Sequence, residues 1–586
     1  MAAKWQLKDI YKGFTRDLDK VRSPEETVRA VKMKFRELEL DILSETVRID
    51  NGRLDIPVYF SVCGADARAL TGTAKQMGKG ATPQQAEASA VMELVERFSF
   101  YHFAGTEKNF VYGTYNQLKD RALPLEQIAR SVHDDTDDLD TALDIFAELP
   151  MKWARARNLT RETDMLVPFD WFFAINEFNG TSAGNCLEEA LCQGICEVVE
   201  RHVSGIVSAE RRRVPGIDPN SAGDPVVSDL LAKYRKAGIA LYVSDFTLDT
   251  GISTIGVLAH DPATFPEKSE LVWTAGTTPN PEKALNRALT EVAQLGGDFN
   301  SGSNYVASGL PKPADLKEAE FILNPPYFSR FHDLPDLSDA NIRVEIQRCI
   351  AALADRGFEV MAIDTGHPLL DVSAVYTLIP GARFRERAAA GSVGLFTAKL
   401  ICEQYPPEIA IEELSDMERR LPDRYYIQFY LGQCHLALDA PETALDHFSK
   451  ALDRQPHTQD IASIYSYMGQ CHKALGQYRQ ALDALEKGRA YDSDRTDIYN
   501  LTGFCYFKLR EHEKAIEAFQ QVLRLHPASA IDYANIATNY REMGDTENAI
   551  AYYRMAVKLD PGIEFARTNL EKLTETLNSG ETQETK

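Results

Sequence analysis

The stretch Thr181–His202 (TSAGNCLEEALCQGICEVVERH) places a row of acids on an otherwise apolar helix, which few folds accommodate. Gly184 and Asn185 predict a turn, and the residues from Leu187 onward suit a helix. A helix that is apolar on most sides is usually buried, so its carboxylates are expected inside, where each is costly unless a cation compensates it. Arg201 can compensate one acid, and a metal ion is expected for the rest. At about 100° per residue, one stripe holds the polar positions of this helix: Glu189, Gln193, Glu197 and Glu200.

The same acid pattern occurs elsewhere in the chain. A shift of 104 residues carries Glu93, Glu96 and Arg97 onto Glu197, Glu200 and Arg201, and Ser89 precedes the first set on the same stripe. A third predicted helix, 281–294, has Arg287, Glu291 and Gln294 at i, i+4 and i+7. Three helices with one layout indicate a repeated site rather than three solvated helix faces.

Composition excludes several classes of function. The chain of 586 residues has a formal net charge of −23, which argues against general binding to nucleic acid or to anionic membranes, because both require a basic surface. The first residues have no signal-peptide h-region, and no apolar run approaches the length of a membrane span. Nine scattered cysteines do not make a disulfide framework. A cytoplasmic protein is therefore expected.

The first 405 residues predict an α+β domain of antiparallel sheet and packed helices. Ser23 and Pro24 are a helix-start signal. Short turns between strands favour antiparallel pairing, with the helices packed on the sheet. Six segments read as strands: 56–63, 239–246, 252–259, 271–278, 358–364 and 373–381. The glycine-rich segment 71–82 reads as a turn, and its Gly78-Lys79-Gly80 does not fit the spacing of a phosphate loop.

The pattern changes near residue 425, after a linker helix expected over 406–424. Gly432, Gly469, Gly503 and Ala537 recur at spacings of 37, 34 and 34 residues, and further small and aromatic residues follow in phase. Paired helices of 34 residues with small residues at close contacts are typical of tetratricopeptide repeats. Residues 425–575 therefore predict about four such repeats in an all-α solenoid, and 576–586 is expected to be a disordered tail.

The residues on the stripes decide which metal fits them. A di-iron site needs Glu-x-x-His pairs, which these helices lack, and the adjacent arginines would repel iron. Cys192 and Cys196 have no second cysteine pair at zinc-site spacing, so packing is the favoured interpretation. Hard oxygen ligands beside arginines instead suit Mg²⁺ that bridges to a polyphosphate.

Four separated motifs resemble the YcaO family, in the family's order and over nearly all of residues 1–400. The motifs are SAVMELVER (89–97), SAGNCLEEALCQGICEVVER (182–201), ALNRALTEVAQ (284–294) and the IPG turn (379–381). The resemblance implies an enzyme that uses ATP and Mg²⁺ to phosphorylate a peptide or protein backbone amide after a nucleophile has added to its carbonyl carbon. The repeats resemble the helical tails that some members carry.

The resemblance also implies roles for individual residues. Lys20 and Thr27 stand at the spacing of a nucleotide-contacting Lys/Ser pair, with Thr in place of Ser. Glu197, Glu200, Arg201 and Arg287 are the expected catalytic residues. The expected Mg²⁺ ligands are Glu93, Glu96, Glu189, Glu197 and Glu200. The expected ATP-binding set is Lys20, Thr27, Ser89, Glu93, Glu96, Arg97, Ser182, Asn185, Glu189, Gln193, Glu197, Glu200, Arg201, Arg287, Glu291 and Gln294.

Azoline-forming members tend to end in a proline-rich tail, whereas this chain has no proline after Pro561. The resemblance therefore favours members outside classical azoline synthesis, namely thioamide formation or an accessory role in methylthiolation of ribosomal protein S12. A homodimer is expected, as is a sulfur-delivering or methylthiotransferase partner held by the repeats. A non-catalytic, nucleotide-sensing scaffold remains open as an alternative.

Overall fold

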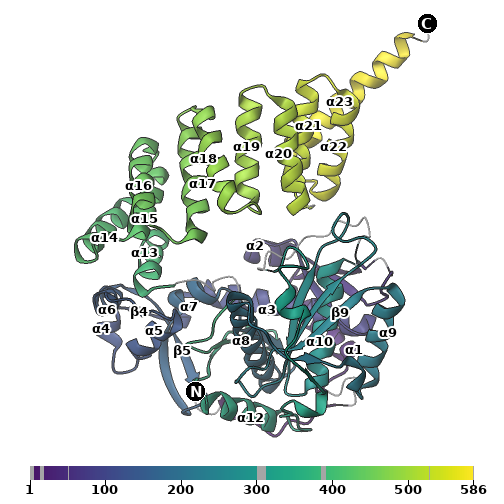
Figure 1. Cartoon of the computed structure of the whole chain (residues 1–586), viewed down its shortest axis with the longest axis vertical. Coiled ribbons are helices and arrows are strands. Elements are labelled where there is room, and N and C mark those ends of the chain that lie inside the picture. Colours follow the sequence, from purple (N-terminus) through teal and green to yellow (C-terminus); the bar gives the residue numbers. More distant parts are fainter. Residues whose placement is uncertain are drawn as a thin grey trace. The chain divides into compact units, whose positions relative to one another are not determined.

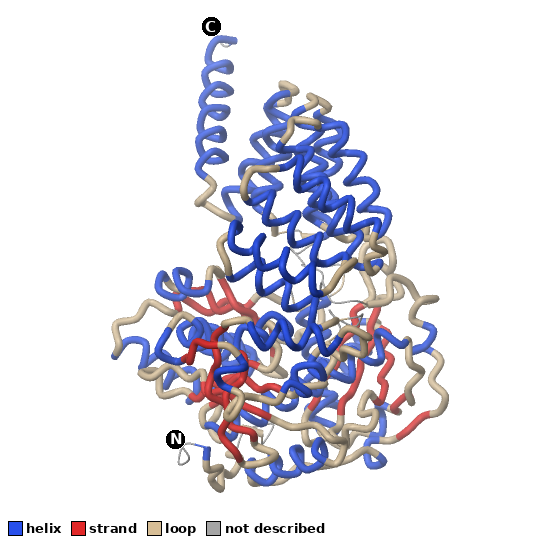
Figure 2. The backbone as a smooth tube through the Cα atoms, turned by 90° about the vertical axis from the view of Figure 1, so that its left-hand side faces the viewer, coloured by secondary structure: helices blue, strands red, loops and turns tan. Residues whose placement is uncertain are grey.

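The structure is a computed structural model that describes residues 5–13, 19–50, 52–297, 299, 312–384, 391–526 and 528–584. It divides into two compact units, one reaching to Phe396 and the other beginning at Thr397, a little before the boundary expected near residue 405. All of the strands lie in the first unit, whereas the second is built of helices (Figure 2). Each unit is considered by itself.

Three sheets form the framework of the first unit. One joins β1 (Leu43–Arg48), β2 (Val58–Cys63) and β3 (Lys75–Lys79). The second has the order β4 (Phe110–Gly113), β5 (Met151–Asn158), β13 (Met361–Asp364), β14 (Ser373–Leu378) and β7 (Thr181–Gly184), with β6 (Thr163–Pro168) paired to β5. The third has the order β11 (Val272–Thr277), β10 (Thr254–His260), β9 (Ala240–Asp245), β8 (Gly216–Ile217) and β12 (Phe328–Ser329).

Every described strand pair except β8–β12 is antiparallel, so the predicted α+β class is confirmed. The six predicted strands are all present. The interpretation of 71–82 as a turn was wrong, because β3 occupies Lys75–Lys79. A glycine inside a strand marks a close backbone approach as well as a turn. Here a Cβ on Gly78 would lie 2.0 Å from the backbone nitrogen of Ala90, on the helix that packs against β3.

The end strands of the three sheets each lead into a long helix. β3 precedes α3 (Pro83–Ala104), β7 precedes α8 (Leu187–Glu210), and β11 precedes α10 (Pro281–Gly296). Each helix packs on its own strand and also on the end strand of another sheet: α3 on β7, α8 on β11, and α10 on β3. The three helices are labelled in Figure 1. The three strand–helix pairs therefore close into a ring that ties the sheets together.

Local sequence explains where these helices begin. Thr82 caps α3 in a capping box with Gln85, and the Asn280 side chain accepts from two amides at the start of α10. α8 has Cys186 at its N-cap and no side-chain cap. Instead, the Glu189 carboxylate accepts from the Asn185 backbone N–H at 2.9 Å. Glu189 therefore has a structural role at the turn before α8.

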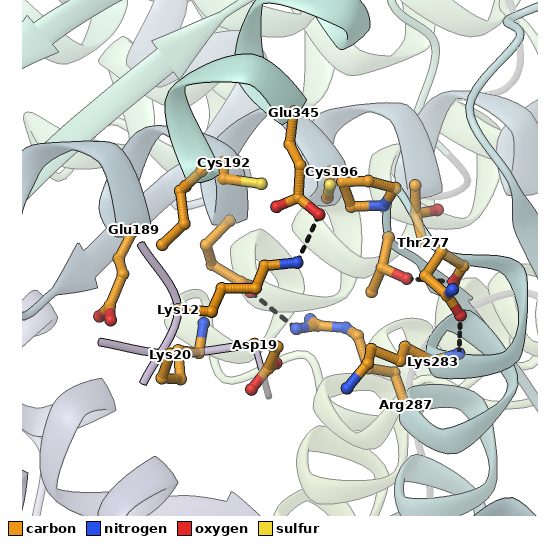
Figure 3. Close-up of a pocket in the computed structure, with 15 residues that line it drawn as sticks. Lys12, Asp19, Lys20, Glu189, Cys192, Cys196, Thr277, Lys283, Arg287 and Glu345 are labelled. Carbon is orange, nitrogen blue, oxygen red and sulfur yellow. Dashed lines mark hydrogen bonds and ion pairs between the residues drawn. The ribbon is translucent and has the colours of Figure 1, made fainter. Parts of the chain in front are cut away.

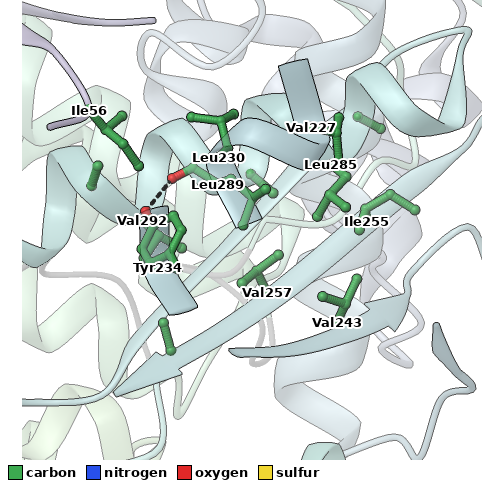
Figure 4. Close-up of a cluster of buried hydrophobic side chains, with 14 of the residues drawn as sticks. Ile56, Val227, Leu230, Tyr234, Val243, Ile255, Val257, Leu285, Leu289 and Val292 are labelled. Atoms are coloured by element: carbon green, nitrogen blue, oxygen red, sulfur yellow. Dashed lines mark hydrogen bonds between the residues drawn. The ribbon is translucent and has the colours of Figure 1, made fainter. Parts of the chain in front are cut away.

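The core of the third sheet packs under α10 and α9 (Pro225–Ala237). Val243, Ile255 and Val257 of β9 and β10 face Leu285 and Leu289 of α10 within one buried cluster (Figure 4). The hydroxyl of buried Tyr234 donates to the Leu289 carbonyl at 2.6 Å. A rigid core behind α10 fixes the helix that carries the third stripe.

The remaining helices of the first unit cover the sheets. The predicted helix start at Ser23 is confirmed, because its side chain caps α1 with Pro24 in the first turn. The helices are α1 (Pro24–Glu37), α2 (Ala65–Thr71), α4 (Tyr115–Leu118), α5 (Leu125–Ser131), α6 (Leu139–Glu148), α7 (Phe169–Asn176), α11 (Glu320–Leu323) and α12 (Ile342–Ala354). Short 3-10 turns occupy Glu107–Asn109, Pro219–Ser221 and Phe331–Asp333.

The second unit is an array of helix pairs, as the repeat spacing predicts. α13 (Val393–Gln404) and α14 (Pro407–Arg420) precede four pairs: α15 (Tyr425–Ala437) with α16 (Pro441–Asp453), α17 (Thr458–Ala474) with α18 (Tyr478–Tyr491), α19 (Thr496–Lys508) with α20 (His512–Leu525), and α21 (Ala530–Glu542) with α22 (Thr546–Leu559). A Cβ on Gly469 or Gly503 would lie 2.7 Å from Leu485 or Phe519 of the paired helix, so the glycines allow the close contact.

The last helix differs from expectation. α23 runs from Glu564 to Glu584 and includes most of the segment for which a disordered tail was expected. Its residues up to Leu577 include three Glu and three Leu, which favour helix. None of the helices in the described part of the chain combines the length and the apolar character that crossing a bilayer requires.

The close contact between β11 and α10 can be tested by adding one methyl group. In Gly276→Ala the new Cβ would lie 2.2 Å from the Ala284 carbonyl oxygen, so the helix must move. We expect the free energy of unfolding in urea to fall by about 1–3 kcal/mol. Gly223→Ala is the control, because its Cβ would meet only a Glu282 side-chain oxygen at 3.7 Å. Equal stability of the two variants would contradict the proposed packing.

Candidate functional site

The three acid stripes occupy equivalent positions on α3, α8 and α10. Counted from the N-caps Thr82, Cys186 and Asn280, the polar residues of each helix fall at the seventh, eleventh and fourteenth places. The sets are Ser89, Glu93 and Glu96 on α3, Gln193, Glu197 and Glu200 on α8, and Arg287, Glu291 and Gln294 on α10. The predicted repetition of a site is therefore also a repetition in the fold.

The α3 stripe meets the end of β7. The Thr181 hydroxyl donates to Glu96 at 2.5 Å, and Arg97 donates to Glu93 at 3.0 Å while its guanidinium lies 4.4 Å from the centre of the Phe178 ring. Burial, and then the neighbouring charge of Glu93, raises the pKa of Glu96 well above its usual range, although Arg97 opposes the shift. Glu96 is thus a carboxyl group that favours its protonated form.

The α8 stripe meets the end of β11. Glu200 is only 4% exposed and accepts the backbone N–H of Thr277 at 3.1 Å. Burial raises the pKa of Glu200, with Glu291 adding to the shift and Arg201 and Arg287 opposing it. Burial likewise raises the pKa of Glu197 to about 7, against the opposing effects of Arg201 and Arg97. For both acids, desolvation therefore raises the pKa by more than the nearby arginines lower it.

The α10 stripe meets the end of β3. Lys79 forms a largely buried ion pair with Glu291, in which the two side chains are 21% and 13% exposed. Burial raises the pKa of Glu291, but Lys79 and Arg201 outweigh it and hold the pKa below its usual value. Arg287 donates to the Gln193 side chain at 2.7 Å and so links α10 to α8. Across the three helices, the stripe acids outnumber the cations that face them.

The N-terminal segment closes one side of α8. Besides the Asn185 amide, Glu189 accepts the backbone N–H of Val21 at 2.6 Å, and the Thr27 hydroxyl donates to the Asn185 side chain at 3.1 Å. Burial, which lowers the pKa of Lys20, is outweighed by Asp19 and Glu189, which raise it, so Lys20 stays charged. The predicted nucleotide-contacting pair Lys20 and Thr27 is thus brought to the start of α8.

A pocket lies between this segment, α8, α10 and α12 (Figure 3). Lys12 is paired with Glu345 at its wall. Cys192 and Cys196, for which packing was the favoured interpretation, also line it, so at least one face of each thiol borders the pocket. The cationic residues that line it are Lys12, Lys20, Lys283 and Arg287. The acids Asp19, Glu189 and Glu345 also line the pocket, so its wall carries both signs of charge.

Ser182, one of the predicted ATP-binding residues, already makes a structural hydrogen bond. The Ser182 hydroxyl is fully buried and donates to the Ala190 carbonyl at 2.7 Å, so it fastens β7 to α8. In the described part of the chain, no three His, Cys, Asp or Glu side chains are grouped as a metal site. The predicted Mg²⁺ ligands Glu93, Glu96, Glu189, Glu197 and Glu200 therefore do not form such a group in the described residues.

Three partners of the acids were not predicted: Lys79, Thr181 and Thr277. Lys79 and Thr277 each stand three residues before the N-cap of the next helix. This shared position before a helix could have been used to predict both residues as site candidates. Their partners Glu291 and Glu200 are far away in sequence, so the contacts themselves depend on the closing of the ring.

Comparisons with known proteins agree with this arrangement. A family model described as a YcaO cyclodehydratase, ATP- and Mg²⁺-binding, matches residues 77–383, and a tetratricopeptide-repeat model matches residues 424–494 and 494–561. An uncharacterised protein of Methanothermobacter thermautotrophicus is 29% identical over 395 residues, which are 61% of this chain and 93% of that protein.

Two further matches cover smaller shares of the compared proteins. The ribosomal protein S12 methylthiotransferase accessory factor YcaO of Escherichia coli is 28% identical over 37% of this chain and 40% of its own length. A heterocyclase solved in complex with substrate and cofactor superposes with a TM-score of 0.54 at 24% identity, over 65% of this chain and 55% of its own. The structural match shows a shared fold.

The raised pKa of Glu197 predicts a pH-dependent stability. Because the pKa rises from 4.5 to about 7 on folding, stability falls as pH rises through that window. Glu197→Gln removes the ionisation. We therefore expect the free energy of unfolding of the variant to exceed that of the parent chain by about 1–3 kcal/mol at pH 8, with a smaller difference at pH 5. Urea unfolding at both pH values measures this. The exposed Glu126→Gln serves as control, and an identical pH profile for Glu197→Gln and the parent chain would contradict the assignment.

The pair of Lys79 and Glu291 predicts a non-additive double-mutant cycle. Lys79→Met leaves the buried Glu291 carboxylate with less positive charge near it, so we expect the free energy of unfolding to fall by about 2–4 kcal/mol. Adding Glu291→Gln removes that carboxylate and should restore part of the loss. Chemical denaturation of the parent chain, both single variants and the double variant gives the coupling energy. Additive effects would refute the pairing.

Proposed function

Because the chain belongs to the YcaO family, whose cofactors are ATP and Mg²⁺, we propose that it activates a backbone amide of a peptide or protein by phosphorylation. The observation that carries this proposal is the ring of three stripes. It gathers carboxylates with raised pKa values beside Arg97, Arg201, Arg287 and Lys79. Acids that lack full compensation favour a divalent cation, and the cations favour the phosphates that accompany it.

The proposed roles follow from what each side chain already contacts. Glu93, Glu96, Glu197 and Glu200 are the proposed Mg²⁺ ligands, and Glu189 is a weaker candidate because its oxygens accept two backbone amides. Ser182, Asn185 and Thr27 hold the turn before α8 and would position it. Lys20, Ser89, Arg97, Gln193, Arg287, Glu291 and Gln294 would contact the nucleotide or its metal.

When bound, ATP would supply the phosphoryl group that converts the amide oxygen into a leaving group, and Mg²⁺ would offset the charge of the phosphates. Arg201 and Arg287 would offset the negative charge that develops during the transfer. Glu197, whose pKa is about 7 without the metal, would give up its proton when it becomes a Mg²⁺ ligand. Glu200 is held by Thr277 and would fix the orientation of its neighbours on α8.

For the product, we propose an outcome other than an azoline, either a thioamide or an accessory contribution to methylthiolation of ribosomal protein S12. The accessory-factor name of the Escherichia coli relative supports the second outcome. The repeats support recruitment of a protein, since such arrays present extended binding surfaces. A sulfur-delivering protein or a methylthiotransferase would suit either outcome.

The nucleotide site is tested by titrating the full chain with AMP-PNP in a calorimeter, with and without Mg²⁺. We expect Mg²⁺-dependent binding that Glu197→Gln and Glu200→Gln weaken at least about tenfold, or about 1.4 kcal/mol. Glu126→Gln should bind as the parent chain does. Unchanged binding in both stripe variants would refute the site. Nucleotide binding with no modified product would favour the non-catalytic, nucleotide-sensing scaffold.

The product is tested by mass spectrometry of proteins from cells that make the parent chain or the Glu197→Gln, Glu200→Gln double variant. Replacement of an amide oxygen by sulfur indicates a thioamide, and loss of water indicates an azoline. A methylthio group on S12 that depends on the parent chain indicates the accessory role. An azoline would overturn the proposed product while leaving the nucleotide site intact.

A further inference from the structure

Two cysteine thiols meet where the second unit begins. Cys402 lies in the last turn of α13 and Cys434 in the last turn of α15, and their sulfur atoms are 3.6 Å apart. Both are free thiols. The sulfurs of a disulfide bond are about 2.0 Å apart, so these two would have to approach by about 1.6 Å. Rotation of the two side chains can supply a movement of that size.

The repeat sequence explains one thiol of this pair but not the other. Cys434, Cys471 and Cys505 recur at spacings of 37 and 34 residues, in phase with the repeat glycines, and all three are buried as small packing residues. Cys402 precedes the repeats and is only partly buried. In the described part of the second unit, neither Cys471 nor Cys505 forms a hydrogen bond with another thiol. The contact with Cys402 is therefore particular to the first repeat.

The two sulfurs are coupled by a hydrogen bond. When Cys434 loses its proton, the Cys402 thiol donates to the thiolate, which lowers the pKa of Cys434. The same hydrogen bond, followed by burial, raises the pKa of Cys402. The pair therefore loses its first proton more easily than its second. A thiolate is the nucleophile in thiol–disulfide exchange, so this pair has a reactive form available.

We propose that Cys402 and Cys434 form a reversible disulfide bond that fastens the end of α13 to α15 under oxidising conditions. Cys402 is the partly exposed thiol, so its sulfur attacks a low-molecular-weight disulfide and releases one thiolate. The Cys434 thiolate then attacks the Cys402 sulfur of this mixed disulfide and releases the second. Two protein thiols are oxidised, and the small disulfide is reduced to two thiols that take up the two protons.

A disulfide explains the pair better than a metal ion does. Structural zinc almost always has four ligands, whereas no three His, Cys, Asp or Glu side chains within the described residues are grouped as a metal site. The neighbours of the Cys402 sulfur are instead the Tyr430 carbonyl at 4.0 Å and the Gln433 side-chain oxygen at 3.9 Å. The pair is thus built as two thiols in contact.

The bond would restrain the beginning of the second unit. The two cysteines are 32 positions apart, and a cross-link over such a separation restricts the unfolded chain and stabilises the folded one. The boundary between the units follows Phe396, inside α13, so the bond would hold the helix in which the second unit begins. The inference is independent of the proposed amide activation, because neither cysteine belongs to the three stripes.

The test equilibrates the full chain in glutathione buffers from fully reduced to fully oxidised and blocks the remaining thiols with iodoacetamide. We expect peptide mapping without reductant to show one linked pair that joins Cys402 to Cys434 and that dithiothreitol separates. Cys402→Ser should abolish the link. Cys471→Ala, which removes a buried cysteine at the equivalent repeat position, should keep it. Hydrogen exchange in the last turn of α13 and in α15 should slow on oxidation of the parent chain and of Cys471→Ala, but not of Cys402→Ser.

Three results would overturn the proposal. The first is that all nine cysteines of the parent chain are still blocked by iodoacetamide after equilibration with oxidised glutathione. The second is a link between other cysteines, such as Cys192 and Cys196, while Cys402 and Cys434 stay reduced. The third is unchanged hydrogen exchange in α13 and α15 when mapping shows the two cysteines to be joined. Circular dichroism establishes that each variant is folded before its link is scored.

Discussion

Burial of carboxylates between helices and the ends of neighbouring strands is the constraint on which the first unit depends. Glu96, Glu200 and Glu291 each leave water, and each is met by a group at the end of another sheet: Thr181, Thr277 and Lys79. A hydroxyl or an amide satisfies hydrogen bonding but adds no positive charge, so Glu96 and Glu200 keep raised pKa values. Of these three acids, only Glu291, which is paired with Lys79, has a pKa below its usual value.

The three stripes therefore differ in how far cations compensate their acids. The stripe of α10 is compensated by Lys79 and carries Arg287, whereas those of α3 and α8 keep acids that burial makes costly to ionise. A divalent cation would lower that cost most at α3 and α8. The proposed binding of a metal nucleotide beside these three helices rests on this uneven compensation.

The sequence was informative where the signal is local. The periodicity of α8 and α10, the Ser23 cap and the 34-residue spacing of the repeats depend on residues close together in the chain. β5 was missed because Arg155 and Arg157 break the apolar alternation of a typical strand, and β3 because its glycine serves close packing on α3. The pairing of each acid with its partner could not be predicted, because Glu200 and Glu291 lie far in sequence from Thr277 and Lys79 and a backbone amide has no residue-specific signal.

The central claim is that the buried stripe acids give up protons when a metal nucleotide binds. Calorimetric titration of Mg²⁺–AMP-PNP near pH 7, in buffers of different ionisation enthalpy, counts the protons exchanged. Because the pKa of Glu197 is about 7, we predict that the parent chain releases more protons than Glu197→Gln does, by about half a proton. Equal proton release by the two proteins, or net proton uptake by the parent chain, would contradict the account.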